Sequence, residues 1–106
     1  MSVIMTLSLP GDPKKIEQQA ASDPAAMQAI LESAKSHGLI AHRFYGSDSG
    51  EIMVIDEWPD EQSFQAFFEE TREKLGPMFE AAGVRSEPQP KFWRRLETRD
   101  EYGWGA

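Results

Sequence analysis

Two β-rich segments, residues 39–45 and 51–58, are separated by only five residues, and this spacing constrains the fold more than any other feature of the sequence. The linker reads Gly-Ser-Asp-Ser-Gly, and these residue types are the ones that tight turns use. A linker this short joins antiparallel strands, whereas parallel strands need a crossover of about a dozen residues or more. The sequence therefore predicts a β-hairpin at the centre of the chain.

Patterned segments also precede this hairpin. Residues 3–9 alternate in the way that is typical of a strand with one covered face. Asp-Pro pairs follow at Asp12 and Asp23, and each predicts the start of a helix. We therefore expect a short helix, a break near Ser22 and a longer helix that is closed by Gly38. The strand face expected to meet the helices comprises Val3, Met5, Leu7 and Leu9, which leaves Ile4, Thr6 and Ser8 on the other face.

The C-terminal half repeats the order of helix and strand. Pro59 and Asp60 predict the start of a helix, and aromatic residues recur behind them at helical spacing. Gly76 and Pro77 are expected to interrupt this helix. A last strand is expected over residues 91–96. The helical residues expected in the core are Phe64, Phe67, Phe68 and Leu75.

The predicted order of elements is β-α-β-β-α-β, which defines a ferredoxin-like α+β fold with a four-stranded antiparallel sheet. Helices cover one face of such a sheet and leave the other bare, so the bare face needs a ligand, a partner or polar side chains. We expect residues 1–96 to form this domain and two copies to pair as a dimeric α/β barrel. Residues 97–106 form a polar tail whose Tyr102 and Trp104 suggest docking on the partner subunit, with disorder as the alternative.

Composition narrows the possible partners. A chain of 106 residues with 40% hydrophobic content suits one domain with one core. A formal charge of −7 disfavours nucleic acids and anionic membranes, because both attract clustered Lys and Arg. No apolar run approaches the roughly 20 residues of a membrane span, and the N-terminus lacks the pattern of a signal peptide, so we expect a cytoplasmic protein. The chain has no Cys, which removes disulfides and thiolate chemistry.

Residues 52–68 carry the most specific motif. A hydrophobic strand ends in Asp56, Glu57 and Trp58, and the helix behind it opens with acidic residues and Phe64. This arrangement resembles the antibiotic-biosynthesis-monooxygenase-like family of dimeric α/β barrels. The resemblance implies a homodimer and, as an activity, oxygenation of aromatic or polyketide-like metabolites without a cofactor.

The chain departs from the family pattern at positions that carry chemistry. Quinone-forming members use an Asn four positions before the motif Trp and a Tyr six positions after it, where this chain has Val54 and Phe64. Of these three residues only Trp58 is retained. Haem-degrading members use an Asn in the first strand together with a Trp and a His on the last long helix. This chain has no Asn and no His after Trp58, so haem degradation is disfavoured.

His42 and Asp56 are the candidate catalytic residues. A hairpin register that places them opposite each other would let the carboxylate orient the imidazole as a general base, whereas a slip of one residue would separate them. The alternative is a structural pair without a role in chemistry. We expect the pair on the bare face of the sheet, where the candidate ligand-binding residues are Thr6, Ser8, Trp58, Trp93 and Arg95. Packing is the first interpretation of the two Trp residues, and an aromatic platform for a planar ligand is the second. For Arg95 the alternative is an ion pair with Glu57 or Glu97.

Two functions remain open at this stage. The first is binding of a small aromatic or polyketide-like metabolite between sheet and helices, with oxygenation as the activity that the resemblance implies. The second is a dimeric ligand-binding or stress-related protein without catalysis. We expect no cofactor and no metal site, because His37 and His42 lie on different predicted elements and no carboxylate cluster has the spacing of metal ligands.

Overall fold

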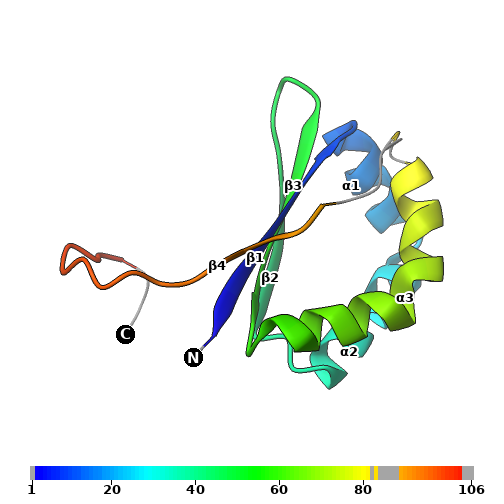
Figure 1. Ribbon diagram of the computed structural model, residues 1–106. Coiled ribbons are helices and arrows are strands. Elements are labelled where there is room, and N and C mark those ends of the chain that lie inside the picture. Colours follow the sequence, from blue (N-terminus) through cyan, green and yellow to red (C-terminus); the bar gives the residue numbers. More distant parts are fainter. Residues whose placement is uncertain (1, 82, 84–88, 104–106) are drawn as a thin grey trace.

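The computed structural model describes residues 2–81, 83 and 89–103, and its elements follow the predicted order (Figure 1). None of the described helices is both long and apolar enough to cross a membrane. The strands are β1 (Val3–Pro10), β2 (Ala41–Gly46), β3 (Glu51–Trp58) and β4 (Lys91–Trp93), and the helices are α1 (Pro13–Ser22), α2 (Pro24–Ser36) and α3 (Glu61–Ala81).

The strands form a four-stranded sheet in the order β2-β3-β1-β4 within the described residues. Every neighbouring pair is antiparallel. The helices α1, α2 and α3 lie on one side of this sheet, and the described chain leaves the other side bare (Figure 1). This is the predicted ferredoxin-like α+β architecture.

Aspartate caps explain where α1 and α2 begin. The carboxylate of Asp12 accepts a hydrogen bond from the backbone N–H of Lys14 at 3.0 Å, and that of Asp23 accepts one from Ala26 at 3.2 Å. A proline follows each aspartate at the first helical position, where its missing N–H costs nothing. The predicted break near Ser22 is confirmed, because Asp23 ends one helix and caps the next.

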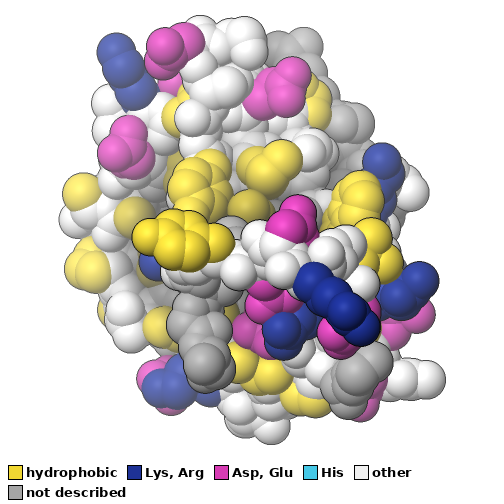
Figure 2. Space-filling view, turned by 90° about the vertical axis from the view of Figure 1, so that its left-hand side faces the viewer, with side chains coloured by type: hydrophobic (Ala, Val, Ile, Leu, Met, Phe, Trp, Pro, Cys, Tyr) yellow, Lys and Arg dark blue, Asp and Glu magenta, His cyan; other side chains and the backbone are white. Residues whose placement is uncertain are grey.

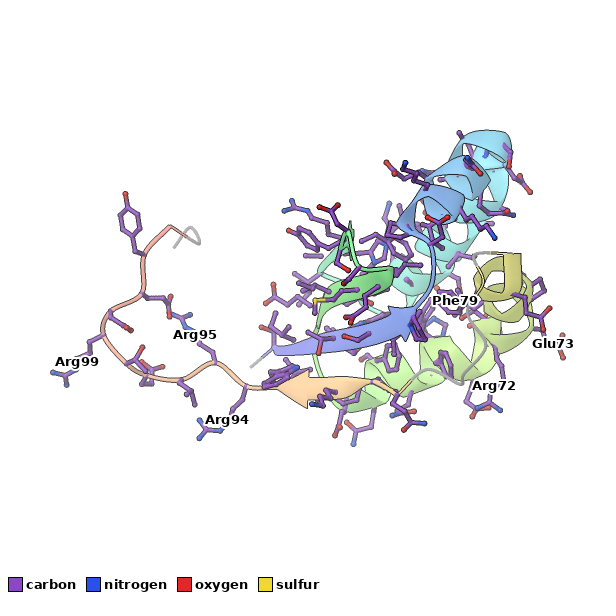
Figure 3. The ribbon with its side chains drawn as sticks, turned by 90° about the horizontal axis from the view of Figure 1, so that it is seen from above. Arg72, Glu73, Phe79, Arg94, Arg95 and Arg99 are labelled. Carbon is purple, nitrogen blue, oxygen red and sulfur yellow. The ribbon has the colours of Figure 1, made fainter. Side chains whose placement is uncertain are left out.

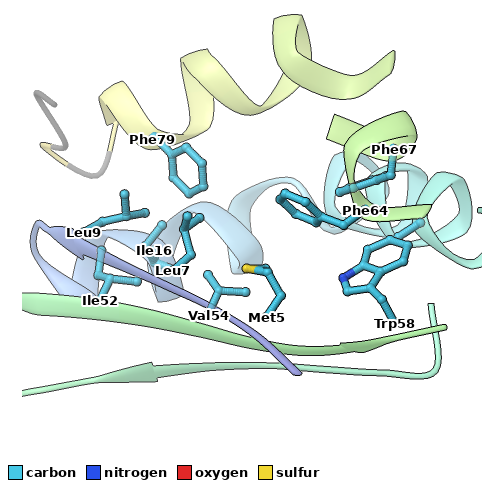
Figure 4. Packing of buried hydrophobic residues seen from close by; sticks show 11 residues of the cluster. Met5, Leu7, Leu9, Ile16, Ile52, Val54, Trp58, Phe64, Phe67 and Phe79 are labelled. Atoms are coloured by element: carbon cyan, nitrogen blue, oxygen red, sulfur yellow. The ribbon is translucent and has the colours of Figure 1, made fainter. Parts of the chain in front are cut away.

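The core lies between the sheet and the helices (Figure 4). Trp58 at the end of β3 is fully buried, and the rings of Phe64 and Phe67 pack against it with centroid distances of 5.8 and 5.4 Å. These two Phe residues are core residues, as the helical spacing predicts. Phe68 and Leu75 are partly buried against the same cluster.

The expected interruption of the last helix is wrong, because α3 continues through Gly76 and Pro77 to Ala81. Proline has no N–H for the carbonyl of Glu73 and disfavours a helical residue before it, largely through contact with that residue's Cβ. Gly76 has no Cβ, so the helix continues and its axis bends along its course (Figure 1). Continuation places Phe79 in the core at 8% exposure.

The last strand is shorter than the predicted 91–96. β4 ends at Trp93, and from Arg94 the chain projects away from the sheet (Figure 3). Trp93 pairs with Ile4, next to the start of β1, so the neighbouring strand offers almost no further residues for the ladder. In the tail, Tyr102 is 94% exposed, and Trp104 lies outside the described residues.

Candidate functional site

His42 and Asp56 lie directly opposite each other on β2 and β3. Of the two registers that the sequence left open, this is the one that brings the pair together. Nδ1 of His42 is 2.7 Å from Oδ1 of Asp56, and 32% of the His42 side chain is exposed against 6% of the Asp56 side chain. A carboxylate this buried needs hydrogen-bond partners, and His42 provides one of them.

Trp58 provides a second partner for Asp56. Its Nε1–H donates to Oδ2 at 3.1 Å from two residues along the same strand, where side chains share a face. Because Trp58 is fully buried, it packs in the core, in agreement with the first interpretation of the sequence, and it orients the carboxylate. The spacing of Asp56 and Trp58 along a strand was the sequence signal for this contact.

The His42–Asp56–Trp58 chain has the geometry of an oriented general base. An ionised carboxylate only accepts hydrogen bonds, so the hydrogen between His42 and Asp56 belongs to Nδ1. Nε2 of the neutral ring then keeps its lone pair and can take up a proton. Asp56 would stabilise the imidazolium that forms.

The dyad borders a cavity of about 80 Å³ between the sheet and the helices. Among its described lining residues, His42 and Asp56 are polar and the others are apolar, including Phe64 and Phe68 of α3. A cavity of roughly 150 Å³ is needed to hold benzene, so this cavity by itself admits only a fragment of an aromatic ligand. Its lining is nevertheless that of a small-molecule pocket, with few polar groups in an apolar wall.

The structure divides the candidate residues between the two faces of the sheet, and the expectation of one shared face is wrong. Thr6, Ser8 and Trp93 lie on the bare face, where the indole Nε1–H of Trp93 donates to Oγ1 of Thr6 at 2.8 Å. Asp56 lies opposite Met5, and Met5 faces the helices. The alternation of side chains along β3 therefore places the dyad and Trp58 on the covered face.

Arg95 lies apart from both groups. It follows the end of β4, on the projecting tail, and its side chain points away from the body of the molecule (Figure 3). Its guanidinium binds Glu101 through two hydrogen bonds, of 2.8 and 2.6 Å. The expected ion pair is thus present with a different acidic residue, and 72% of the Arg95 side chain is exposed.

The second histidine belongs to a different cluster. His37 caps the C-terminus of α2, as the sequence predicts. Its Nδ1 is 2.9 Å from the carbonyl oxygen of Ser33, and its Nε2 is 3.0 Å from a carboxylate oxygen of Glu70 on α3. In the described part of the chain, no three His, Cys, Asp or Glu side chains are grouped so that they could hold a metal ion.

Comparisons by sequence find no matching family model and no matching curated protein. Comparison with solved structures gives clear matches. A conserved protein from Methanosarcina mazei Go1 has a TM-score of 0.65 at 15% identity, with 91% of this chain and 94% of that chain covered. A monooxygenase from the gene ActVA-Orf6 of Streptomyces coelicolor, in complex with the ligand Nanaomycin D, has a TM-score of 0.65 at 17% identity, with 91% and 89% covered.

A candidate antibiotic biosynthesis monooxygenase from Bordetella bronchiseptica has a TM-score of 0.63 at 11% identity, and the match covers 91% of this chain and 98% of that chain. The chain therefore has the fold of antibiotic biosynthesis monooxygenase-like proteins. At these identities the likeness concerns the fold alone. The chemistry has to be argued from the residues of this chain.

Proposed function

We propose that this protein binds a small aromatic or polyketide-like molecule between its sheet and its helices and removes a proton from it with the His42–Asp56 dyad. The observation that carries the proposal is the position of an oriented imidazole at the edge of an otherwise apolar cavity. Trp58 acts as a positioning residue, because its indole N–H holds the second oxygen of Asp56.

The reaction that best suits this site is oxidation of a phenolic ring by dioxygen. Nε2 of His42 takes the phenolic proton, and the resulting phenolate is electron-rich enough to react with oxygen. The ring supplies four electrons; one oxygen atom becomes the new carbonyl of a quinone, and the other leaves as water. The substrate itself is the reductant, so the proposal requires no redox cofactor. An apolar wall suits such a substrate, because the planar ring is held by packing rather than by ion pairs.

Binding without catalysis is the second candidate function. The observation that favours it is the complete hydrogen bonding of the Asp56 carboxylate by His42 and Trp58, since a structural network would have the same geometry. Thr6, Ser8, Trp93 and Arg95 have no part in the proposed pocket.

Titration with hydroxylated naphthalenes and anthrones tests these two functions. Saturable binding, oxygen uptake and the absorbance of a quinone would support the oxidation, with one oxygen molecule consumed for each quinone formed. Saturable binding with unchanged ligand would support the second function. The absence of binding by every member of the series would contradict both.

We also propose that the protein is a homodimer built on the bare face of the sheet. Ile4, Met53, Tyr45 and Trp93 are large apolar residues on this face, with 36% to 51% of each exposed. Figure 2 views the molecule from this side, and hydrophobic side chains gather there. A second copy of the chain would cover them, and the projecting tail would then lie against the partner subunit.

A further inference from the structure

A groove on the outer surface lies next to the internal cavity. It has a volume of about 420 Å³ and runs between the N-terminal half of α2 and the C-terminal half of α3, where Pro77 forms part of its wall. Met27 and Ile30 line both the groove and the cavity. These two side chains of α2 therefore separate the cavity from the groove, and we call them the partition.

The volumes of the cavity and the groove indicate that a ligand of ordinary size would occupy both of them. The cavity of about 80 Å³ is smaller than the roughly 300–1,000 Å³ of typical small-molecule sites. The combined volume of the cavity and the groove lies within that range. A molecule with two or more fused rings does not fit within this cavity alone, and movement of the partition would join the cavity to the groove.

The partition lies at the end of α2 whose side chains are less deeply buried. The fully buried residue of this helix is Ala34, near its C-terminus, where His37 also bridges to Glu70 of α3. Met27 and Ile30 lie closer to its N-terminus and are only partly buried. That end follows the break at Asp23, so a small swing of α2 about its C-terminal anchor would separate it from α3.

The side chains of the partition are suited to such an opening. Met27 is unbranched and has several rotatable bonds, so it can change rotamer without displacing its neighbours. Across the groove, Pro77 removes one backbone hydrogen bond from α3. Neither wall of the groove is therefore as rigid as the sheet that forms the floor of the cavity.

We infer that Met27 and Ile30 form a gate through which a planar, apolar ligand of at least two fused rings enters between α2 and α3. This inference rests on the proposed function and specifies how its site is reached. In the bound state one ring, with its hydroxyl group, lies in the cavity near His42. The remainder of the ligand occupies the groove.

The rate at which 1-naphthol binds to the full chain, followed by stopped-flow fluorescence, tests the gate. Ile30→Ala removes part of the partition and should raise the association rate constant by about tenfold or more, because binding no longer waits for a conformational change. Ile40→Ala is the matched control, since it makes the same truncation at an exposed Ile that is not among the residues lining the cavity or the groove. It should leave the association rate within about twofold of wild type.

A second pair of variants leaves the core intact. Ala29 is exposed and lines the groove, whereas Ala25 is exposed on the same helix and is not among its lining residues. Ala29→Trp should fill the groove and weaken 1-naphthol binding by about tenfold or more, and Ala25→Trp should have no such effect. Equal rates for Ile30→Ala and Ile40→Ala, or unchanged binding in Ala29→Trp, would overturn the gate and leave the proposed function standing. Failure of 1-naphthol and of every other hydroxylated naphthalene and anthrone to bind to wild type and to Ile30→Ala would overturn both.

Discussion

The carboxylate of Asp56 lies where a sheet normally places apolar side chains, and a buried charge is costly unless hydrogen bonds replace its water. Each of its oxygens has one partner, His42 or Trp58. Removing either partner leaves part of the charge unsatisfied, which costs more than the lost hydrogen bond itself is worth. The partners differ in access, because His42 is about a third exposed and Trp58 is fully buried. Substitutions at these two positions therefore separate chemistry from stability.

His42→Gln tests the chemistry. The amide of Gln can donate a hydrogen bond to Asp56 but cannot act as a base, so folding should be nearly unchanged while turnover falls by roughly 10²–10⁴-fold. Oxygen uptake with a phenolic substrate, compared at equal folded fractions, measures the effect. Asp56→Asn should lower turnover in the same way. Full activity in a stable His42→Gln protein would exclude the general base.

Trp58→Phe tests the positioning role. Phe keeps an aromatic ring in the core but cannot donate to Oδ2 of Asp56, so the free energy of unfolding should fall by about 1–3 kcal/mol. The pH profile of turnover should also shift, because the carboxylate that orients His42 is altered. In urea titrations the double variant Asp56→Asn/Trp58→Phe should lose less stability than the two single variants predict together. Additive losses with an unshifted pH profile would show that Trp58 only packs.

At this scale the sequence predicted the hairpin but neither its register nor the surroundings of the dyad. The short loop predicted antiparallel neighbours, and only one of the possible registers places His42 opposite Asp56. The polar character of both residues suggested the bare face. Ile52, Val54 and Trp58 alternate with more exposed residues along β3, however, and Asp56 falls in their phase. Strand periodicity was therefore the better guide than polarity, because one buried carboxylate is tolerated where two donors reach it.

At the scale of elements, α3 carries the largest share of aromatic packing. Phe67 is 6% exposed, whereas Phe68 is only partly buried. Phe67→Ala should lower the free energy of unfolding by about 3–5 kcal/mol, since it leaves a cavity against Trp58. Phe68→Ala should cost clearly less. Similar losses at the two positions in denaturant titrations would mean that the phase of this helix is misassigned.

The carboxylate of Asp60, at the start of α3, should make the stability of the fold depend on pH. Its carboxylate accepts hydrogen bonds from the backbone N–H and the hydroxyl of Ser63, both at 2.8 Å, and these lower its pKa below the ordinary value of 3.8. A lowered folded-state pKa stabilises the fold above the unfolded value, and this contribution is lost as the pH falls through the folded pKa. Asp60→Ala should therefore lower the denaturant midpoint at neutral pH, and the gap to wild type should narrow below pH 3.8.

Asp48→Ala, in the exposed hairpin loop, serves as the control for the Asp60 series. Its midpoint should follow that of wild type at every pH. A gap between Asp60→Ala and wild type that stays constant into the acidic range would contradict the assignment of the effect to the carboxylate. The same measurement would then point to the loss of side-chain packing at the start of α3.

The order of the elements was predictable because each boundary has a local cause. Asp12 and Asp23 cap helices through their own carboxylates, and the hairpin follows from a five-residue linker. The errors concern boundaries that depend on distant parts of the chain. α3 continues through Pro77 because Phe79 gains a place in the core, and β4 stops at Trp93 because β1 has almost no residues left to pair.

At the scale of the whole molecule, helices cover only one face of the sheet in the described part of the chain. The strand register places Arg43 and Glu57 on the same face as apolar side chains such as Trp93. Figure 2 shows charged side chains of both signs beside hydrophobic ones on this face. Mixed faces of this kind suit an interface between identical subunits, because a twofold axis brings each patch against its own copy. The tail beyond β4 extends from the same side of the sheet, so a partner would also provide its only large contact surface among the described residues.

Equilibrium sedimentation should find two chains per particle at micromolar concentration, since the large apolar side chains exposed on the bare face are of the kind that a stable interface covers. Met53→Arg introduces a charge on this face and should give a folded monomer with an unchanged far-UV circular dichroism spectrum. Gln28→Arg adds the same charge on the exposed surface of α2 and should stay dimeric. Because each chain carries a formal charge of −7, the wild-type dimer should tighten as salt screens the repulsion. If the wild-type protein is a monomer at every salt concentration, the proposal of a dimeric barrel is wrong. The proposals about the cavity, the gate and the His42–Asp56 dyad would stand, because these features lie within a single chain.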